Sequence, residues 1–181
     1  PFAQIAADIE KHVACPHLVL EDRAECIRRA ILDGKDARVI LLTGKGEETT
    51  MKRGSVFVPY PSDVELTLKY LAEYDKAHPA APASSGKKAA VIGDMAELGD
   101  LTESAHREIG ELTKELGIDT VIAIGARAKN FLEGNGSVQW FQSVEEAMDA
   151  IKAAFAADTA MLVKASHSMH FETIVEELTK A

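Results

Sequence analysis

The chain has 181 residues, a formal net charge of −9, 46% hydrophobic residues and 27% charged residues. These values are typical of a folded globular protein, and they exclude disordered and fibrous classes. The acidic balance argues against nucleic acid or an anionic membrane as partner, because phosphate binding needs clustered Lys and Arg. No apolar run approaches the roughly 18–20 residues of a membrane span.

The ends and the cysteines of the sequence give three further expectations. No secretory signal opens it, and the two cysteines, Cys15 and Cys26, are too few for a disulfide framework. We therefore expect a cytoplasmic protein. Because the first residue is Pro1 rather than Met, we also expect a piece of a longer chain.

A linker divides the chain. The run DKAHPAAPASSGKK, from Asp75 to Lys88, is rich in Pro, Ser and Gly and favours neither helix nor strand. The predicted organisation is a partial α/β unit over 1–74, a linker over 75–86 and an α/β domain over 87–181.

The first part alternates helical and extended patterns. We expect helices over 2–13, 24–32 and 63–74, and extended segments over 17–20, 39–43 and 55–59. Ser62 followed three residues later by Glu65 predicts a capping box at the start of the third helix.

The second part repeats the alternation more strongly. We expect buried strands over 89–93, 119–125 and 161–164, an extended segment over 138–141, and helices over 102–116, 126–132, 144–155 and 169–178. Apolar strands alternating with amphipathic helices predict an α/β fold of Rossmann-like type: a mostly parallel sheet with helices on both faces. Ligands bind such sheets beyond the carboxyl ends of the strands.

The two parts show a similar pattern of residues when the chain is shifted by 121 positions. Glu25 then falls on Glu146, and the run 39–42 falls on 160–163. The pattern suggests two related α/β ends in tandem, although any two strand–helix–strand units can align in this way.

Candidate chemistry lies in three loops that follow strands. The first loop, 43–48, offers two glycines for close backbone approach, Lys45 for an anionic group and Glu48 for an ammonium group. The loop lacks the P-loop pattern. The alternative to ligand binding is that it forms a tight turn whose charged side chains are solvated.

The second loop, 93–99, contains two carboxylates between glycines. Asp94 and Glu97 are candidates to bind a metal or a cationic group; alternatively, Asp94 caps a turn. His106 follows in the next helix, where a structural hydrogen-bonding role is commoner than a catalytic one.

The third loop, 164–170, holds Lys164, Ser166, His167 and His170. The two histidines have the spacing of one helix face, but no third ligand is near them, so we expect no metal site. No nucleophile elbow is present, and we expect no catalytic residue within this chain.

Residues 87–181 resemble the C-terminal domain of Mur ligases, in particular the ligase that adds D-alanyl-D-alanine to a muramoyl tripeptide. The motifs that carry this resemblance are Gly93-Asp94-Met95, Glu97-Leu98-Gly99, His106 and Gly110. The late element of the family, VKGSR followed by Met, differs here: Ala165 replaces its glycine and His167 its arginine.

Residues 1–60 resemble the end of another member, the ligase that adds a diamino acid to a muramoyl dipeptide. The matches are Pro1, Ile5, Asp8-Ile9, Asp22-Arg23 and Gly44-Lys45-Gly46. The resemblance implies substrate-binding roles for Gly44, Lys45, Glu48 and Arg23. The helix over 63–74 fits either resemblance, so the sequence leaves open whether residues 1–60 fold separately or extend the second sheet.

Both resemblances imply a substrate-presenting C-terminal domain of a cytoplasmic, ATP-dependent peptidoglycan ligase. Its partners would be a UDP-N-acetylmuramoyl peptide, an amino acid or D-alanyl-D-alanine, and the N-terminal and central ligase domains, with no nucleic acid and no membrane. ATP and Mg²⁺ are expected in the full-length enzyme, with neither bound by this piece alone, which we expect to be inactive. The alternative is a non-catalytic Rossmann-like binding or assembly module.

Overall fold

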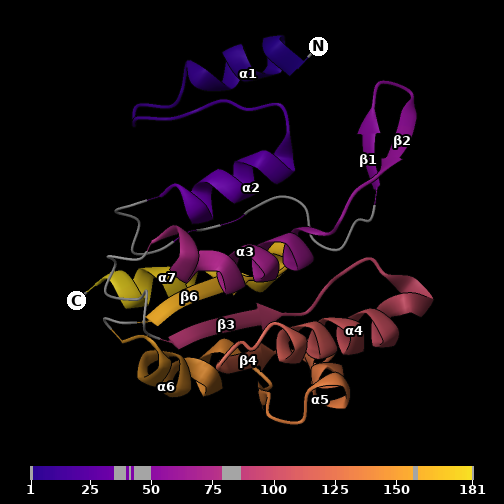
Figure 1. The fold of residues 1–181 in the computed structure, drawn as a ribbon, viewed down its shortest axis with the longest axis vertical. Coiled ribbons are helices and arrows are strands. Elements are labelled where there is room, and N and C mark those ends of the chain that lie inside the picture. The colour runs from indigo at the N-terminus through magenta and orange to yellow at the C-terminus, as the bar shows by residue number, and fades with distance from the viewer. Residues whose placement is uncertain are drawn as a thin grey trace.

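The computed structural model describes residues 2–34, 40, 42, 50–78, 87–156 and 159–180. Its centre is a four-stranded sheet in the order β5-β4-β3-β6, and every neighbouring pair is parallel. The strands are β3 (Lys87–Gly93), β4 (Thr120–Ile124), β5 (Gln139–Phe141) and β6 (Thr159–Lys164). Figure 1 shows β3 and β6 side by side between the helices. The predicted α/β fold with a parallel sheet is confirmed.

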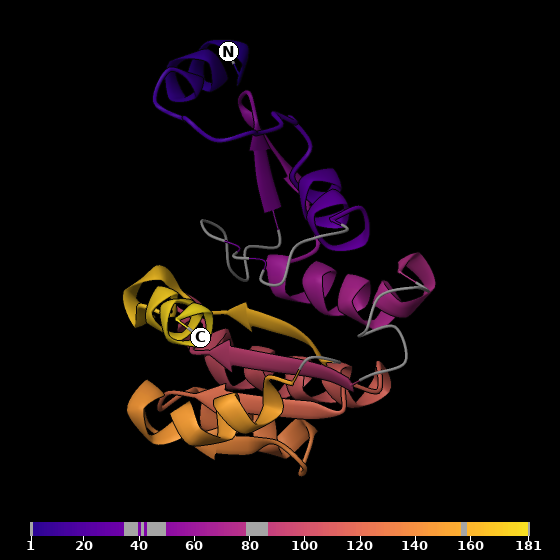
Figure 2. The ribbon, with the colours of Figure 1, turned by 90° about the vertical axis from the view of Figure 1, so that its left-hand side faces the viewer.

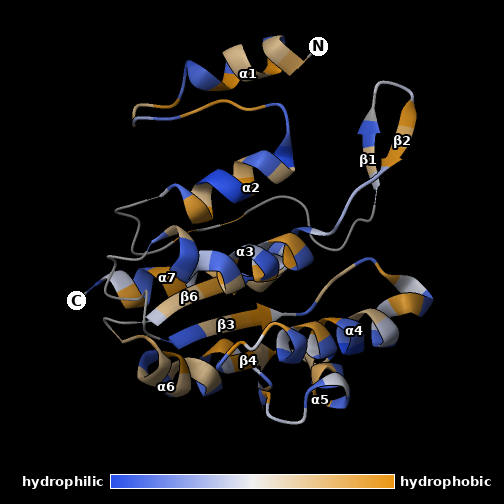
Figure 3. Cartoon of the chain, in the orientation of Figure 1, coloured by the Kyte–Doolittle hydropathy of each residue, from blue (hydrophilic) through white to orange (hydrophobic). Residues whose placement is uncertain are grey.

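The strands are apolar because both faces of the sheet are covered. Successive side chains point to opposite faces, so Ala90 and Ile92 enter one hydrophobic cluster while Val91, between them, enters the other. Figure 3 shows β3 hydrophilic at its start and hydrophobic toward its end, and its last five residues are buried. This change places the strand's carboxyl end inside the core.

Helices supply the two covering layers. The first cluster joins the sheet to α3 (Asp63–Ala77), α4 (Thr102–Glu115) and α5 (Phe131–Gly134). The second joins it to α6 (Val144–Ala154) and α7 (Glu172–Thr179). Among the described residues, three short 3₁₀ helices, at 99–101, 128–130 and 167–169, lie in the connections.

The N-terminal part lies on one side of this sheet domain. It contains α1 (Phe2–Glu10), α2 (Arg23–Leu32) and an antiparallel hairpin of β1 (Thr50–Arg53) and β2 (Val56–Pro59). Both views place α1 farthest from the sheet (Figures 1 and 2). The extended segment expected over 17–20 forms no strand, because these residues are mostly exposed and no described strand pairs with them.

Helix α3 packs on both sides, while the strand expected over 39–43 lies outside the described residues except at 40 and 42. Val64, Leu68 and Leu71 pack toward the sheet, whereas Leu66 packs toward α2 with Tyr60. Within the described residues, the N-terminal part therefore adds no strand to the four-stranded sheet and packs through α2 on the outer side of α3. The division at 75–86 stays a prediction, because 79–86 lie outside the described residues.

A buried ion pair fixes the contact between α2 and α3. Arg23 Nε lies 2.9 and 3.1 Å from the two carboxylate oxygens of Asp63, and the Tyr60 hydroxyl donates to the same carboxylate at 2.9 Å. The Asp63 side chain is fully buried. Burial and the neighbouring carboxylate raise the pKa of Tyr60 above its usual range.

Side chains cap the starts of three helices, and two of these caps are related by the 121-residue shift. Asp22 accepts from the Glu25 N–H at the start of α2, and Ser143 accepts from the Glu146 N–H at the start of α6. These positions are related by the same shift. Ser62 caps α3 as predicted, by accepting from Glu65 N–H. None of the helices in the described ranges combines the length and apolarity needed to cross a bilayer.

Candidate functional site

Three loops meet where the parallel strands end. β3 ends at Gly93, β4 at Ile124 and β6 at Lys164, and these strands are neighbours in the sheet. The carboxyl ends of parallel strands share one edge, so the loops after them lie together. The second and third loops singled out in the sequence are thereby brought into one site.

Asp94 ties the loop after β3 to the loop after β4. Its Oδ1 accepts hydrogen bonds from the backbone N–H groups of Arg127, at 3.0 Å, and Ala128, at 2.7 Å. A carboxylate that accepts two backbone N–H groups acts as a cap for the short helix that begins at Ala128. Of the two interpretations of Asp94, the geometry fits the turn cap.

Close packing at this edge requires glycine at two positions. A Cβ at Gly93 would lie 2.6 Å from both Ala165 Cβ and Met169 Sδ, and one at Gly125 would lie 2.4 Å from Asp94 Oδ1. Gly125 also has a φ of +117°, which other residues rarely adopt. These contacts leave no room for side chains between the three loops.

The loop after β6 completes the connection. The Ser166 Oγ accepts from Ala96 N–H at 3.0 Å, and the Ser166 N–H donates to the Asp94 carbonyl at 3.4 Å. Lys164 is buried at the end of β6 and donates to the Ala165 carbonyl at 3.2 Å. Ser166 therefore acts on the site through the backbone of the neighbouring loop.

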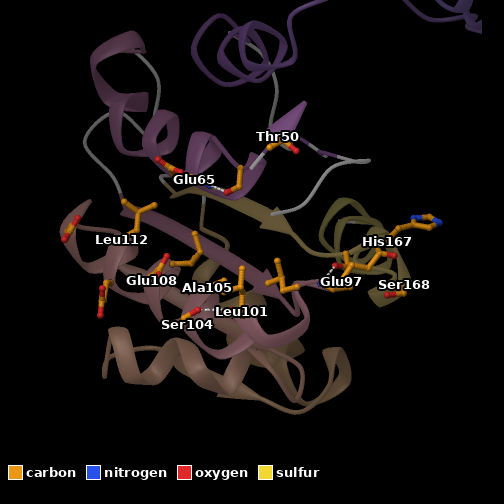
Figure 4. Close-up of a pocket in the computed structure, with 17 residues that line it drawn as sticks. Thr50, Glu65, Glu97, Leu101, Ser104, Ala105, Glu108, Leu112, His167 and Ser168 are labelled. Carbon is orange, nitrogen blue, oxygen red and sulfur yellow. Dashed lines mark hydrogen bonds between the residues drawn. The ribbon is translucent and has the colours of Figure 1, made fainter. Parts of the chain in front are cut away.

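A cavity of about 990 Å³ opens beside these loops. Figure 4 shows it between α4, the start of α3 and the loop that carries His167 and Ser168. Glu97 lines it from the loop after β3, and its backbone has a φ of +66°. Five glutamates face the cavity, with serines and an apolar strip beside them: Glu65, Glu97, Glu108, Glu111 and Glu115. Among the described residues that line it there is no Lys or Arg, but Lys69 lies 2.5 Å from Glu65 and Arg107 lies 4.0 Å from Glu111. The charge of the other three glutamates favours a cationic group over an anion.

Five further residues were predicted for the site. Gly44, Lys45 and Glu48 lie outside the described residues. Arg23 holds Asp63 between α2 and α3 and does not line the cavity. His106 is buried on α4 behind the loop after β3. The substrate-binding role of Gly44, Lys45, Glu48 and Arg23 stays a prediction, and so does a place for His106 in the active site.

The two histidines of the third loop lie near each other, and one of them pairs with a carboxylate. His170 Nδ1 lies 2.9 Å from the Glu172 carboxylate, and the ring centroids of His167 and His170 are 6.1 Å apart. No group of three metal-binding side chains occurs in the part of the chain that the structure describes.

The cavity wall on α4 was missed in the sequence. Ala105, Ile109 and Leu112 follow each other at helical spacing and line the cavity from this helix, and Leu101, in the 3₁₀ helix just before it, continues the series. The spacing was visible, but an apolar helix stripe usually faces a core, and only the fold shows that part of this one borders an opening. Met169 was placed in the third loop and at the start of a helix, and nothing in the sequence indicated that its sulfur accepts from Asp94 N–H, at 2.9 Å.

The fold and the site define a class: a parallel α/β domain with a cavity at the carboxyl edge of its sheet. Comparison with known families goes further. The family model for the "Mur ligase, glutamate ligase domain" matches residues 61–167, which is more than half of the chain. The chain therefore belongs to this family, as the motifs predicted.

Similar proteins support both resemblances. A UDP-N-acetylmuramoyl-tripeptide--D-alanyl-D-alanine ligase of Bacillus subtilis is 33% identical over 102 residues, which are 53% of this chain and 22% of that protein. A UDP-N-acetylmuramoyl-L-alanyl-D-glutamate--2,6-diaminopimelate ligase of Caldanaerobacter subterraneus is 40% identical over 75 residues, which are 41% of this chain and 15% of that protein. The chain thus spans less than a quarter of the length of either relative.

A solved structure agrees on the fold. A crystal structure of MurF from Acinetobacter baumannii superposes with a TM-score of 0.52 at 22% identity, over 77% of this chain and 32% of that one. At this identity the likeness concerns the fold alone.

Proposed function

We propose that this chain is the C-terminal, substrate-presenting domain of an ATP-dependent ligase of peptidoglycan synthesis. The observation that carries the proposal is that the family match, residues 61–167, includes the loops after β3 and β4 and the start of the loop after β6. These loops form the carboxyl edge of the sheet, and two of them border the cavity. The family assignment and the site thus fall on the same residues.

In the proposed reaction, the carboxylate of a UDP-N-acetylmuramoyl peptide takes the terminal phosphoryl group of ATP. The incoming amine attacks the resulting acyl phosphate, the amine loses a proton, and inorganic phosphate leaves as the amide forms. We assign ATP and Mg²⁺ to the central domain of a longer cytoplasmic enzyme. This domain would present the amine when it closes over that site.

The proposed amine is D-alanyl-D-alanine. The 33% identical relative of Bacillus subtilis and the motifs of residues 87–181 support this choice, and the glutamates of the cavity suit an ammonium group. A diamino acid is the second candidate, because the 40% identical relative is a 2,6-diaminopimelate ligase and its motif falls on Gly44–Glu48. The family assignment favours either ligase role over a non-catalytic module.

A titration of the 181-residue chain tests the proposal. We expect calorimetric heat with D-alanyl-D-alanine and none with L-alanyl-L-alanine, which has the same charges and the opposite hand. Binding of diaminopimelate alone would support the second candidate. Silence with both D-alanyl-D-alanine and diaminopimelate would count against substrate presentation by this domain. The chain alone should form no amide from ATP and a UDP-N-acetylmuramoyl peptide.

A further inference from the structure

His106 is fully buried on α4, and both of its ring nitrogens have a backbone partner. Nδ1 lies 2.6 Å from the Thr102 carbonyl oxygen, and Nε2 lies 3.1 Å from the Met95 backbone nitrogen. A carbonyl oxygen only accepts and a backbone N–H only donates. Nδ1 must therefore carry the proton and Nε2 must be the acceptor, which is possible only in the neutral ring.

The loop after β3 is held by three successive backbone N–H groups. Asp94 N–H donates to Met169 Sδ, Met95 N–H to His106 Nε2 and Ala96 N–H to Ser166 Oγ. His106 is the contact that comes from α4; the other two come from the segment after β6. The residues that follow, 96–98, form one wall of the cavity.

We propose that His106 is a positioning residue that holds the cavity wall 96–98 against α4 through the Met95 N–H, and that a proton on its ring releases this wall. His106 does not line the cavity, so it acts through the loop. Its importance for ligation rests on the proposed function, whereas its hold on the loop does not.

The surroundings of the ring favour the neutral form. Burial lowers the pKa of His106 below its ordinary value; Asp94, on the loop, opposes this shift, and Arg127, after β4, adds to it. The neighbouring aromatic ring, Phe131 on α5, carries no charge and lies 5.2 Å away. A protonated ring would point an N–H at the Met95 N–H, so two donors would face each other.

This arrangement gives a defined dependence on pH. Above about pH 6.5, the ring is neutral in both the held and the released loop, and the hold is at its full strength. As the pH falls below that value, the released form takes up a proton first. When the held form stays neutral, the population of the released loop rises about tenfold between pH 7.5 and 5.5.

Amide hydrogen exchange of the 181-residue chain tests the proposal without any ligand. We expect the protection factor of the Met95 N–H to fall about tenfold from pH 7.5 to 5.5, and the ring ¹⁵N shifts at pH 7.5 to show a proton on Nδ1. In H106Q, whose amide oxygen can replace Nε2 as acceptor, protection should be retained and independent of pH. In H106A it should be lost at both values. H12Q, a change at an exposed histidine, should behave as the wild type.

Three results would overturn the proposal: a proton on Nε2, the wild-type pH dependence in H106Q, or unchanged Met95 protection in H106A. If H106A does not fold, the ring shifts and H106Q still decide. A failure of the proposed ligase function would instead appear in substrate titrations, which this experiment does not use.

Discussion

Replacing Asp94 with alanine removes the carboxylate that joins the loops after β3 and β4. The N–H of Ala128, a fully buried residue, loses its acceptor, and an unsatisfied buried donor costs about 1–3 kcal/mol. The N–H of Arg127 belongs to an exposed residue, so water replaces its partner at little cost. The expected loss of unfolding free energy is about 2 kcal/mol, within the range for removal of a helix cap.

Asparagine at the same position separates hydrogen bonding from charge. It keeps an oxygen acceptor for both N–H groups and loses only the charge, so we expect D94N to lose about 1 kcal/mol. E97A is the matched control, because Glu97 lies in the same loop, is exposed and holds no loop together; its change should stay within about 0.5 kcal/mol.

Urea unfolding of the three variants measures these differences, and thermal scans should show D94A melting roughly 4–8 °C below the wild type. A loss in D94A no larger than that in E97A would refute the assignment of Asp94 as a cap. Equal losses in D94A and D94N would show that the charge, rather than the acceptor geometry, matters.

Two further substitutions test the packing. G110A places a Cβ 2.3 Å from a backbone oxygen of α5, and we expect a loss of about 1–3 kcal/mol in urea; G136A, with no atom within 4 Å of its Cβ, is the control, and equal effects would contradict the reasoning. D63A leaves Arg23 without its buried carboxylate, and we expect roughly 2–3 kcal/mol, reduced because the arginine side chain is 29% exposed. D8A, which breaks an exposed ion pair, is the control and should change the unfolding free energy by less than about 1 kcal/mol. A loss in D8A as large as that in D63A would contradict the importance of burial for the Arg23–Asp63 pair.

The fold of residues 87–180 could be predicted because periodicity and burial agree there. The strand at 89–93 is continuous and apolar, and the helices around it show one apolar stripe each, as a sheet covered on both faces requires. The N-terminal part was harder. Segment 17–20 has the composition of a strand, but no described strand pairs with it. The β1–β2 hairpin is mostly exposed, so the sequence of β1 shows no alternation of apolar and polar residues that would predict a strand.

The site could be predicted only as a set of loops. The sequence placed Asp94, Ser166 and His106 near strand ends or helix starts, and the structure brings them together. It could not show that the Asp94 carboxylate and the Ser166 hydroxyl are occupied by backbone N–H groups of other loops. Such partners are distant in the chain, and only the parallel order of β4, β3 and β6 makes them neighbours.

The central claim is that residues 61–181 can serve as the C-terminal domain of a Mur ligase. The most direct measurement inserts this segment into the Bacillus subtilis tripeptide–D-alanyl-D-alanine ligase, in place of that enzyme's own C-terminal domain. Amide formation by the resulting variant is followed by mass spectrometry. Controls are the native enzyme and the enzyme without its C-terminal domain. We predict ATP-dependent addition of D-alanyl-D-alanine to the UDP-N-acetylmuramoyl tripeptide, well above the truncated enzyme. A folded exchange variant that is no more active than the truncated enzyme, with either D-alanyl-D-alanine or diaminopimelate and the matching peptide, would contradict the claim.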